Sequence, residues 1–168
     1  MQGRILSIRR FPVVAAALLA LVAAVGCGDS GSSSTEVQLK TSSLSKAEFT
    51  KRANAVCAKT RVKFEKETVG FMGQMQTNPP KPSDTSPEIN FVKTIFVPNF
   101  QAQIKGISAI GAPRGEETKV RAFLVALQEV VDNANNDPMS YIKADGYHKF
   151  GKAPQLARAS GLTGCAEI

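Results

Sequence analysis

The chain has 168 residues, of which 43% are hydrophobic and 21% are charged, and this balance is typical of a folded globular domain. Its 21 basic and 14 acidic residues leave a formal net charge of +7, and a mean hydropathy of −0.09 excludes a polytopic membrane protein. Because His148 is the one histidine, most histidine-based metal sites, Ser-His-Asp triads and Cys-His nucleophiles are excluded. We expect neither a metal nor a cofactor.

Residues 1–26 have the layout of a secretory signal peptide. Arg4, Arg9 and Arg10 precede an uncharged apolar run, residues 13–26, that is rich in Ala, Leu and Val. The run is shorter than the roughly 20 residues that a membrane-spanning helix needs, and it ends in small residues as a processing site does. We therefore expect export by the general route, with a short membrane anchor and the twin-arginine route as the alternatives.

Cys27 directly follows this apolar run and begins a polar tract, Cys-Gly-Asp-Ser-Gly-Ser-Ser-Ser-Thr. The arrangement resembles the lipobox of bacterial lipoproteins, with small residues at Val25 and Gly26 and with Ala24 where that family usually has Leu. The resemblance implies cleavage before Cys27 and attachment of acyl chains such as palmitate to this cysteine. Two acyl chains suffice to hold a domain stably on a membrane, here the outer face of the bacterial cell membrane.

Three cysteines in an exported protein leave one unpaired, and lipidation of Cys27 accounts for it. Cys57 and Cys165 then form an even pair in an oxidising compartment, where a disulfide is the expected state. The alternatives are a reactive thiol, which needs a nearby base, and a metal site, for which these residues offer too few ligands. A disulfide would tie the start of the fold to its end and contribute on the order of 4 to 5 kcal/mol.

Residues 27–43 are rich in Ser, Thr and Gly and predict a flexible linker, after which residues 44–168 form the folded domain. Ser45 and Glu48 form a capping box that begins a helix reaching about Met75. The prolines within residues 76–86 predict a loop.

A second helix is expected from Ser86 to about Gly111, with Pro98 kinking or splitting it. A third begins near Glu116 and carries a wide apolar stripe. The acidic and amide residues 132–137 fail the spacing of a calcium-binding loop, so we expect a helix end there, with Asp137 capping a new helix. The last helical segment is residues 147–160, with Gly161 as its end cap.

These patterns predict an all-α protein, a small up-and-down bundle of three to four helices closed by one disulfide. Residues 45–166 loosely resemble small secreted or lipid-anchored helical proteins of actinobacteria, a group without an assigned activity. The resemblance implies a bundle and no catalysis.

Three groups of side chains are candidate functional sites. Phe71, Met72 and Met75 together with Phe96 and Phe100 suit a pocket for an apolar ligand, although core packing explains the same residues. The basic residues of the first helix suit an anionic partner, although acids four residues away, as in the pair Glu48 and Arg52, are typical of a solvated face. His148 suits acid-base chemistry, although no recognisable nucleophile accompanies it.

We therefore expect a non-catalytic lipoprotein that binds or scaffolds a component of the cell envelope. Its expected partners are the membrane, through lipid on Cys27, and an envelope protein, lipid or wall polymer. Nucleic acid is not expected as a partner of an exported protein. A carrier of a small apolar ligand is the alternative, and an envelope enzyme is the weaker one.

Overall fold

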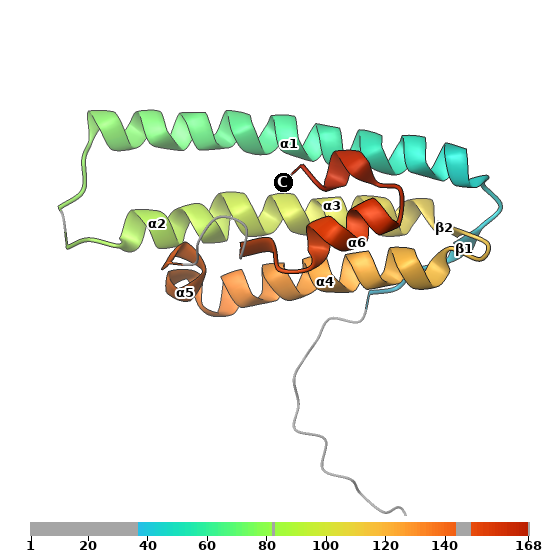
Figure 1. Cartoon of the computed structure of the whole chain (residues 1–168). Helices are drawn as coiled ribbons and strands as arrows, with labels where there is room; N and C mark the ends of the chain where they lie inside the picture. Colours follow the sequence, from blue (N-terminus) through green and yellow to red (C-terminus); the bar gives the residue numbers. More distant parts are fainter. Residues whose placement is uncertain (1–36, 82, 144–148, 168) are drawn as a thin grey trace, which may run out of the picture. The chain divides into compact units, whose positions relative to one another are not determined.

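The computed structural model describes residues 37–81, 83–143 and 149–167 (Figure 1). Residues 1–26, where we expect a signal peptide, therefore lie outside the described residues, as do Cys27 and His148. The elements are, in chain order, β1 (Thr41–Ser42), α1 (Lys46–Thr77), α2 (Ser86–Phe91), η1 (Val92–Phe96), α3 (Val97–Ile110), β2 (Ala112–Pro113), α4 (Glu117–Asn136), α5 (Pro138–Lys143), α6 (Ala153–Ala159) and η3 (Thr163–Cys165). This architecture confirms the predicted helical bundle.

The beginning of α1 confirms the predicted capping box. The hydroxyl oxygen of Ser45 accepts a hydrogen bond from the backbone N–H of Glu48 at 3.2 Å. This bond satisfies one of the N–H groups that have no partner within the helix. The helix continues to Thr77, slightly beyond the predicted end near Met75.

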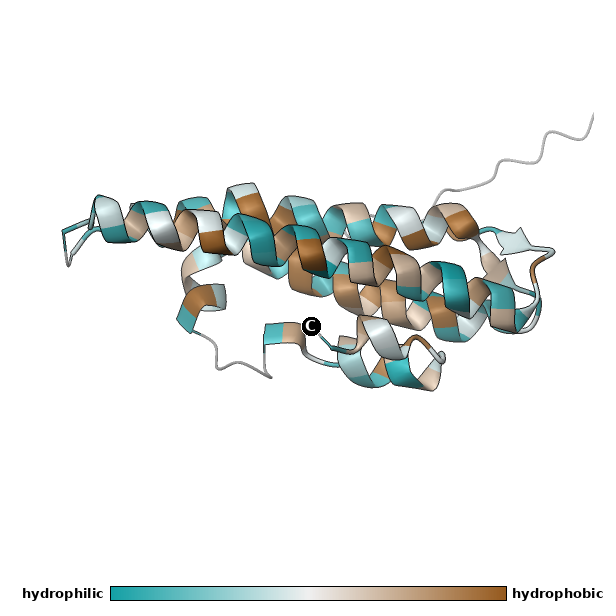
Figure 2. Cartoon of the chain, turned by 90° about the horizontal axis from the view of Figure 1, so that it is seen from above, coloured by the Kyte–Doolittle hydropathy of each residue, from teal (hydrophilic) through white to brown (hydrophobic). Residues whose placement is uncertain are grey.

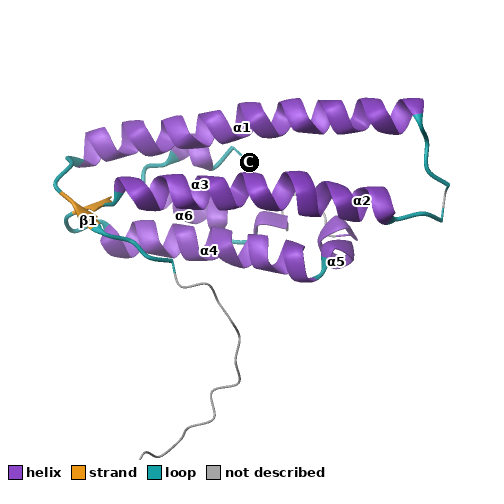
Figure 3. Cartoon of the chain, turned by 180° about the vertical axis from the view of Figure 1, so that it is seen from behind, coloured by secondary structure: helices purple, strands orange, loops and turns teal. Residues whose placement is uncertain are grey.

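The segment α2–η1–α3 accommodates Pro98 without a break, and Figure 3 shows α2 and α3 in line. A proline lacks the N–H that would bond one turn back, and its ring crowds that carbonyl. The turn before Pro98 is accordingly a wider π-helical turn, η1, in which the N–H of Val97 bonds to the carbonyl of Val92. Pro98 thus widens one turn of a continuous rod, where the sequence predicted a kink or a split.

The long helices pack side by side around one core. In Figure 1, α1, the α2–α3 rod and α4 run in alternating directions, and α3 contacts both α1 and α4. The helices α1, α3 and α4 each bury residues on one side, and hydrophobic and hydrophilic bands alternate along the ribbons in Figure 2. The largest side chains that are fully buried are Phe49, Phe96, Phe123, Ile107, Leu124, Leu127 and Leu162.

A short parallel strand pair, β1 with β2, was not predicted. Thr41 pairs with Ala112, and the N–H of Ala112 donates to the carbonyl of Lys40 at 2.8 Å. Val37 is only 7% exposed, and Arg121 Nη1 donates to its carbonyl at 3.2 Å. Residues 37–43, which the sequence placed in the flexible linker, therefore pack on the bundle, because backbone pairing and one buried valine hold them.

The C-terminal segment closes the bundle, with α6 packed on α4 and η3 packed on α1. Cys57 and Cys165 form the predicted disulfide, with an S–S distance of 1.99 Å. Gly161 has a φ of 75° and ends α6 as predicted, with the N–H of Leu162 bonding to the carbonyl of Ala157. None of the helices in the described ranges is long and apolar enough to cross a bilayer.

Candidate functional site

A cleft of about 230 Å³ lies where the C-terminal half of α1 meets α2, η1 and α5. Its volume suits a small ligand, since pockets for drug-sized molecules are usually larger. The lining residues are Thr68, Phe71, Met72, Glu88, Phe91, Val92, Tyr141, Ile142 and Lys149. Segments that are far apart in the sequence thus build it together.

The aromatic wall of the cleft comes from separate elements. The ring centroids of Phe71 on α1 and Phe91 on α2 are 5.2 Å apart, and those of Phe64 and Phe91 are 6.0 Å apart. Tyr141 on α5 packs against the buried ring of Phe96 with centroids 4.5 Å apart. Such aromatic pairs add packing energy beyond the area that they bury, so they give the cleft a preformed wall.

The five residues predicted for an apolar pocket do not lie together in the structure. Phe71 and Met72 line the cleft, and Met72 is 53% exposed. Met75 lies in a neighbouring open hollow that also contains Phe71. Phe96 and Phe100 are 2% and 3% exposed and stack with centroids 4.6 Å apart, so they belong to the core.

Two polar atoms at the cleft were not foreseen from the sequence. Thr68 Oγ1 and Glu88 Oε2 are both buried, and neither has a hydrogen-bond partner in the described part of the chain. A buried polar atom without a partner costs free energy, more so when it belongs to a carboxylate. From the sequence, Glu88 is only an acid in the first turn of a helix, because the segments that line the cleft around its Oε2 atom are brought together by the fold.

The cleft also contains a cation and a phenol. Lys149 Nζ lies 5.5 Å from the centroid of the Tyr141 ring, close enough for a cation–π interaction. Burial raises the pKa of the Tyr141 phenol well above its usual value. The phenol stays neutral at physiological pH, as an ordinary tyrosine does, and the Lys149 ammonium lies beside its ring.

A second group of buried polar side chains lies between α1 and α3. Asn99 Nδ2 donates to Glu67 Oε2 at 2.5 Å and to the carbonyl of Ile95 at 2.7 Å. Gln103 is fully buried, and neither of its amide atoms has a partner among the described residues. None of the cavities described above is lined by these residues, so we assign them to the helix interface.

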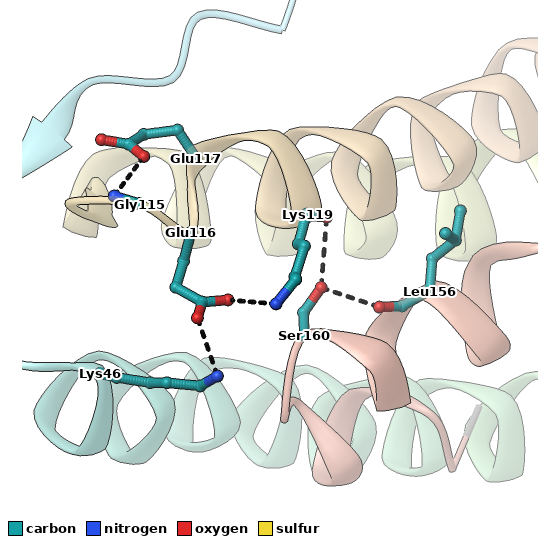
Figure 4. A network of polar contacts seen from close by, with 7 residues as sticks. All are labelled: Lys46, Gly115, Glu116, Glu117, Lys119, Leu156 and Ser160. Atoms are coloured by element: carbon teal, nitrogen blue, oxygen red, sulfur yellow. Dashed lines mark hydrogen bonds and ion pairs between the residues drawn. The ribbon is translucent and has the colours of Figure 1, made fainter.

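A polar network at the opposite end of α1 is structural (Figure 4). Glu116, which precedes α4, pairs with Lys46 at 2.9 Å and with Lys119 at 3.3 Å. The hydrogen bond from Lys46 is the main cause that lowers the pKa of the Glu116 carboxyl. Ser160 Oγ lies 2.8 Å from the carbonyl oxygen of Leu156 and 3.2 Å from that of Lys119, which connects α6 to α4. The network joins three helices.

The basic residues of α1 are partly paired along an exposed face. Arg52 bonds to Glu48 at 2.8 Å, as the spacing predicted, and Lys63 lies 3.5 Å from Glu67. Arg61 pairs with Glu167 of the C-terminal tail at 2.6 Å. Exposed pairs of this kind contribute little stability, and they fit an ordinary solvated face.

Residues 132–137 do not form a loop, since α4 continues through Asn136. Asp137 Oδ1 accepts from the N–H of Ser140 at 2.9 Å and caps α5 as predicted. Over the described ranges, no group of three or more His, Cys, Asp and Glu residues is placed to hold a metal ion.

The chain matches no protein-family model, no curated protein and no solved structure. The basis for a function therefore lies in its own residues.

Proposed function

We propose that this protein is an exported lipoprotein, held on the outer face of the bacterial membrane by acyl chains on Cys27. Its helical domain binds or scaffolds a component of the cell envelope and has no catalytic role. The observation that carries the proposal is the disulfide between Cys57 and Cys165. Disulfides are typical of oxidising compartments, and this one leaves Cys27, directly after the apolar run, as the remaining cysteine.

A second candidate function is the binding of a small amphipathic ligand. The cleft around Phe71 and Met72 favours it, because apolar walls surround two oxygens that lack partners among the described residues. The two functions are compatible, since a lipid-anchored domain can carry a ligand close to the membrane.

Intact mass spectrometry of the protein from its own membranes tests the anchor. We expect a chain that begins at Cys27 and carries acyl mass, and that gains two hydrogen atoms on reduction. The variant Cys27→Ser should lose both the acyl mass and the membrane association, whereas Ser33→Ala, in the same polar tract, should keep both. An unlipidated wild-type chain would overturn the proposal.

A further inference from the structure

The cleft contains buried acceptor oxygens that no donor of the described chain satisfies. These atoms are Thr68 Oγ1 on α1 and Glu88 Oε2 on α2. Most of the remaining residues that line the cleft are apolar. Hydrogen bonds to a charged group are the stronger ones, so the carboxylate of Glu88 gains most from a donor that itself carries a positive charge.

The aromatic rings favour the same charge. Phe71, Phe91 and Tyr141 line the cleft, and the faces of such rings attract cations. Lys149 provides an internal example, since its ammonium already lies 5.5 Å from the centroid of the Tyr141 ring. A carboxylate ligand would instead meet the charge of Glu88 in a partly desolvated place, which is unfavourable.

We infer that this cleft binds a small organic cation, a primary alkylammonium. Its ammonium group donates to Glu88 and Thr68, and its alkyl chain packs on Phe71, Met72 and Phe91. This inference rests on the second candidate function, the carriage of a small ligand, and it identifies the ligand's chemical class. It does not depend on the lipid anchor.

Isothermal titration calorimetry with three probes of equal chain length tests the inference. The purified protein is titrated with hexylammonium, hexanol and hexanoate in the same buffer, and injections of each probe into buffer alone correct for the heat of dilution. We expect hexylammonium to bind at least about tenfold more tightly than hexanol, as one charge-assisted hydrogen bond predicts. Hexanoate should bind most weakly.

Variants assign the charge preference to named residues. Glu88→Gln should weaken hexylammonium binding by about tenfold or more and leave hexanol nearly unchanged. Glu65→Gln, which removes the same charge from an exposed position on α1, is the matched control and should change neither affinity. Lys149→Met should strengthen hexylammonium binding, because it removes a competing cation from the Tyr141 ring.

Several results would overturn the inference. Equal affinities for the three probes would show a cleft without charge preference, and no binding of any probe would show no site. Tightest binding of hexanoate, lost in Lys149→Met, would make the ligand an acid. If Glu88→Gln lowers the thermal stability, its weaker binding could come from partial unfolding. The hexylammonium affinity of Lys149→Met is then the deciding measurement, since Lys149 is partly exposed and its replacement should leave the fold intact. Failure here leaves the mass measurement of Cys27 untouched, so the two proposals fail separately.

Discussion

Gly111 shows how one residue position depends on a segment about seventy positions earlier in the chain. Its φ of 75° lies in the left-handed region, and a Cβ added there would be 2.9 Å from the carbonyl oxygen of Lys40. Gly115 has a φ of 85°, but a Cβ there would meet nothing within 4 Å. At both positions a residue with a Cβ would be strained by the left-handed backbone. Only at Gly111 would the Cβ also be too close to the segment that contains β1.

We predict that Gly111→Ala destabilises the protein more than Gly115→Ala does. The alanine at 115 should cost about 1–2 kcal/mol for its left-handed backbone. The alanine at 111 should cost about a further 1–3 kcal/mol, because the segment around Lys40 must move. Urea unfolding followed by circular dichroism measures both losses. Equal losses would mean that the contact with β1 contributes nothing to stability.

At the scale of elements, the crossing of α1 and α3 depends on one missing side chain. A Cβ added at Gly106 on α3 would be 2.9 Å from Val56 Cγ1 on α1, which is too close for real atoms. Gly73 on α1 has open space around its Cβ position. Glycine within a helix normally costs about 0.5–1 kcal/mol relative to alanine, so Gly106 is explained by packing and Gly73 is not.

We predict opposite effects for alanine at these two helical glycines. Gly73→Ala should stabilise the protein by about 0.5–1 kcal/mol. Gly106→Ala should destabilise it by about 1–2 kcal/mol, because the clash with Val56 outweighs the gain in helix propensity. Thermal unfolding of the single variants gives both values.

The double variant Val56→Ala/Gly106→Ala provides the control for that clash. In the Val56→Ala background, Gly106→Ala should become neutral or stabilising, a coupling of about 1–3 kcal/mol. If Gly106→Ala costs the same with and without Val56, the two helices are not limited by this contact.

At the scale of the whole molecule, the C-terminal tail is attached to α1 by several bonds. The disulfide joins residues that are 108 positions apart. Beside it, the N–H of Gly164 donates to Asn54 Oδ1 at 3.1 Å, and Arg61 pairs with Glu167. The tail and α6 thereby cover the side of the bundle between α1 and α4.

We predict that reduction of the disulfide lowers the free energy of unfolding by about 4–5 kcal/mol, the chain-entropy value for a loop of this size. Hydrogen exchange should accelerate most at residues 163–166, because this tail then depends on weaker bonds. Chemical unfolding with and without reductant measures the loss. The double variant Cys57→Ala/Cys165→Ala should not respond to reductant, and an unchanged midpoint in the wild type would contradict the prediction.

The helices were predictable because their signals are local. The cap at Ser45, the cap at Asp137 and the end at Gly161 each involve bonds within five residues of the chain, so sequence alone locates them. The apolar stripe of α4 likewise needs only the helical period. Pro98 indicated an irregularity, but whether the rod widens or breaks there depends on what packs around it.

The sequence by itself determined the helical class, the order of the long helices and the cysteine pair, and it predicts an export signal at residues 1–26. Only the tertiary structure decided that Val37 is buried, that β1 pairs with β2, and that Glu88 and Thr68 line one cleft together with Tyr141. The physical reason is the separation along the chain over which each interaction acts. Caps and periodicity act over a few residues, whereas burial of a carboxylate depends on side chains that only folding brings together.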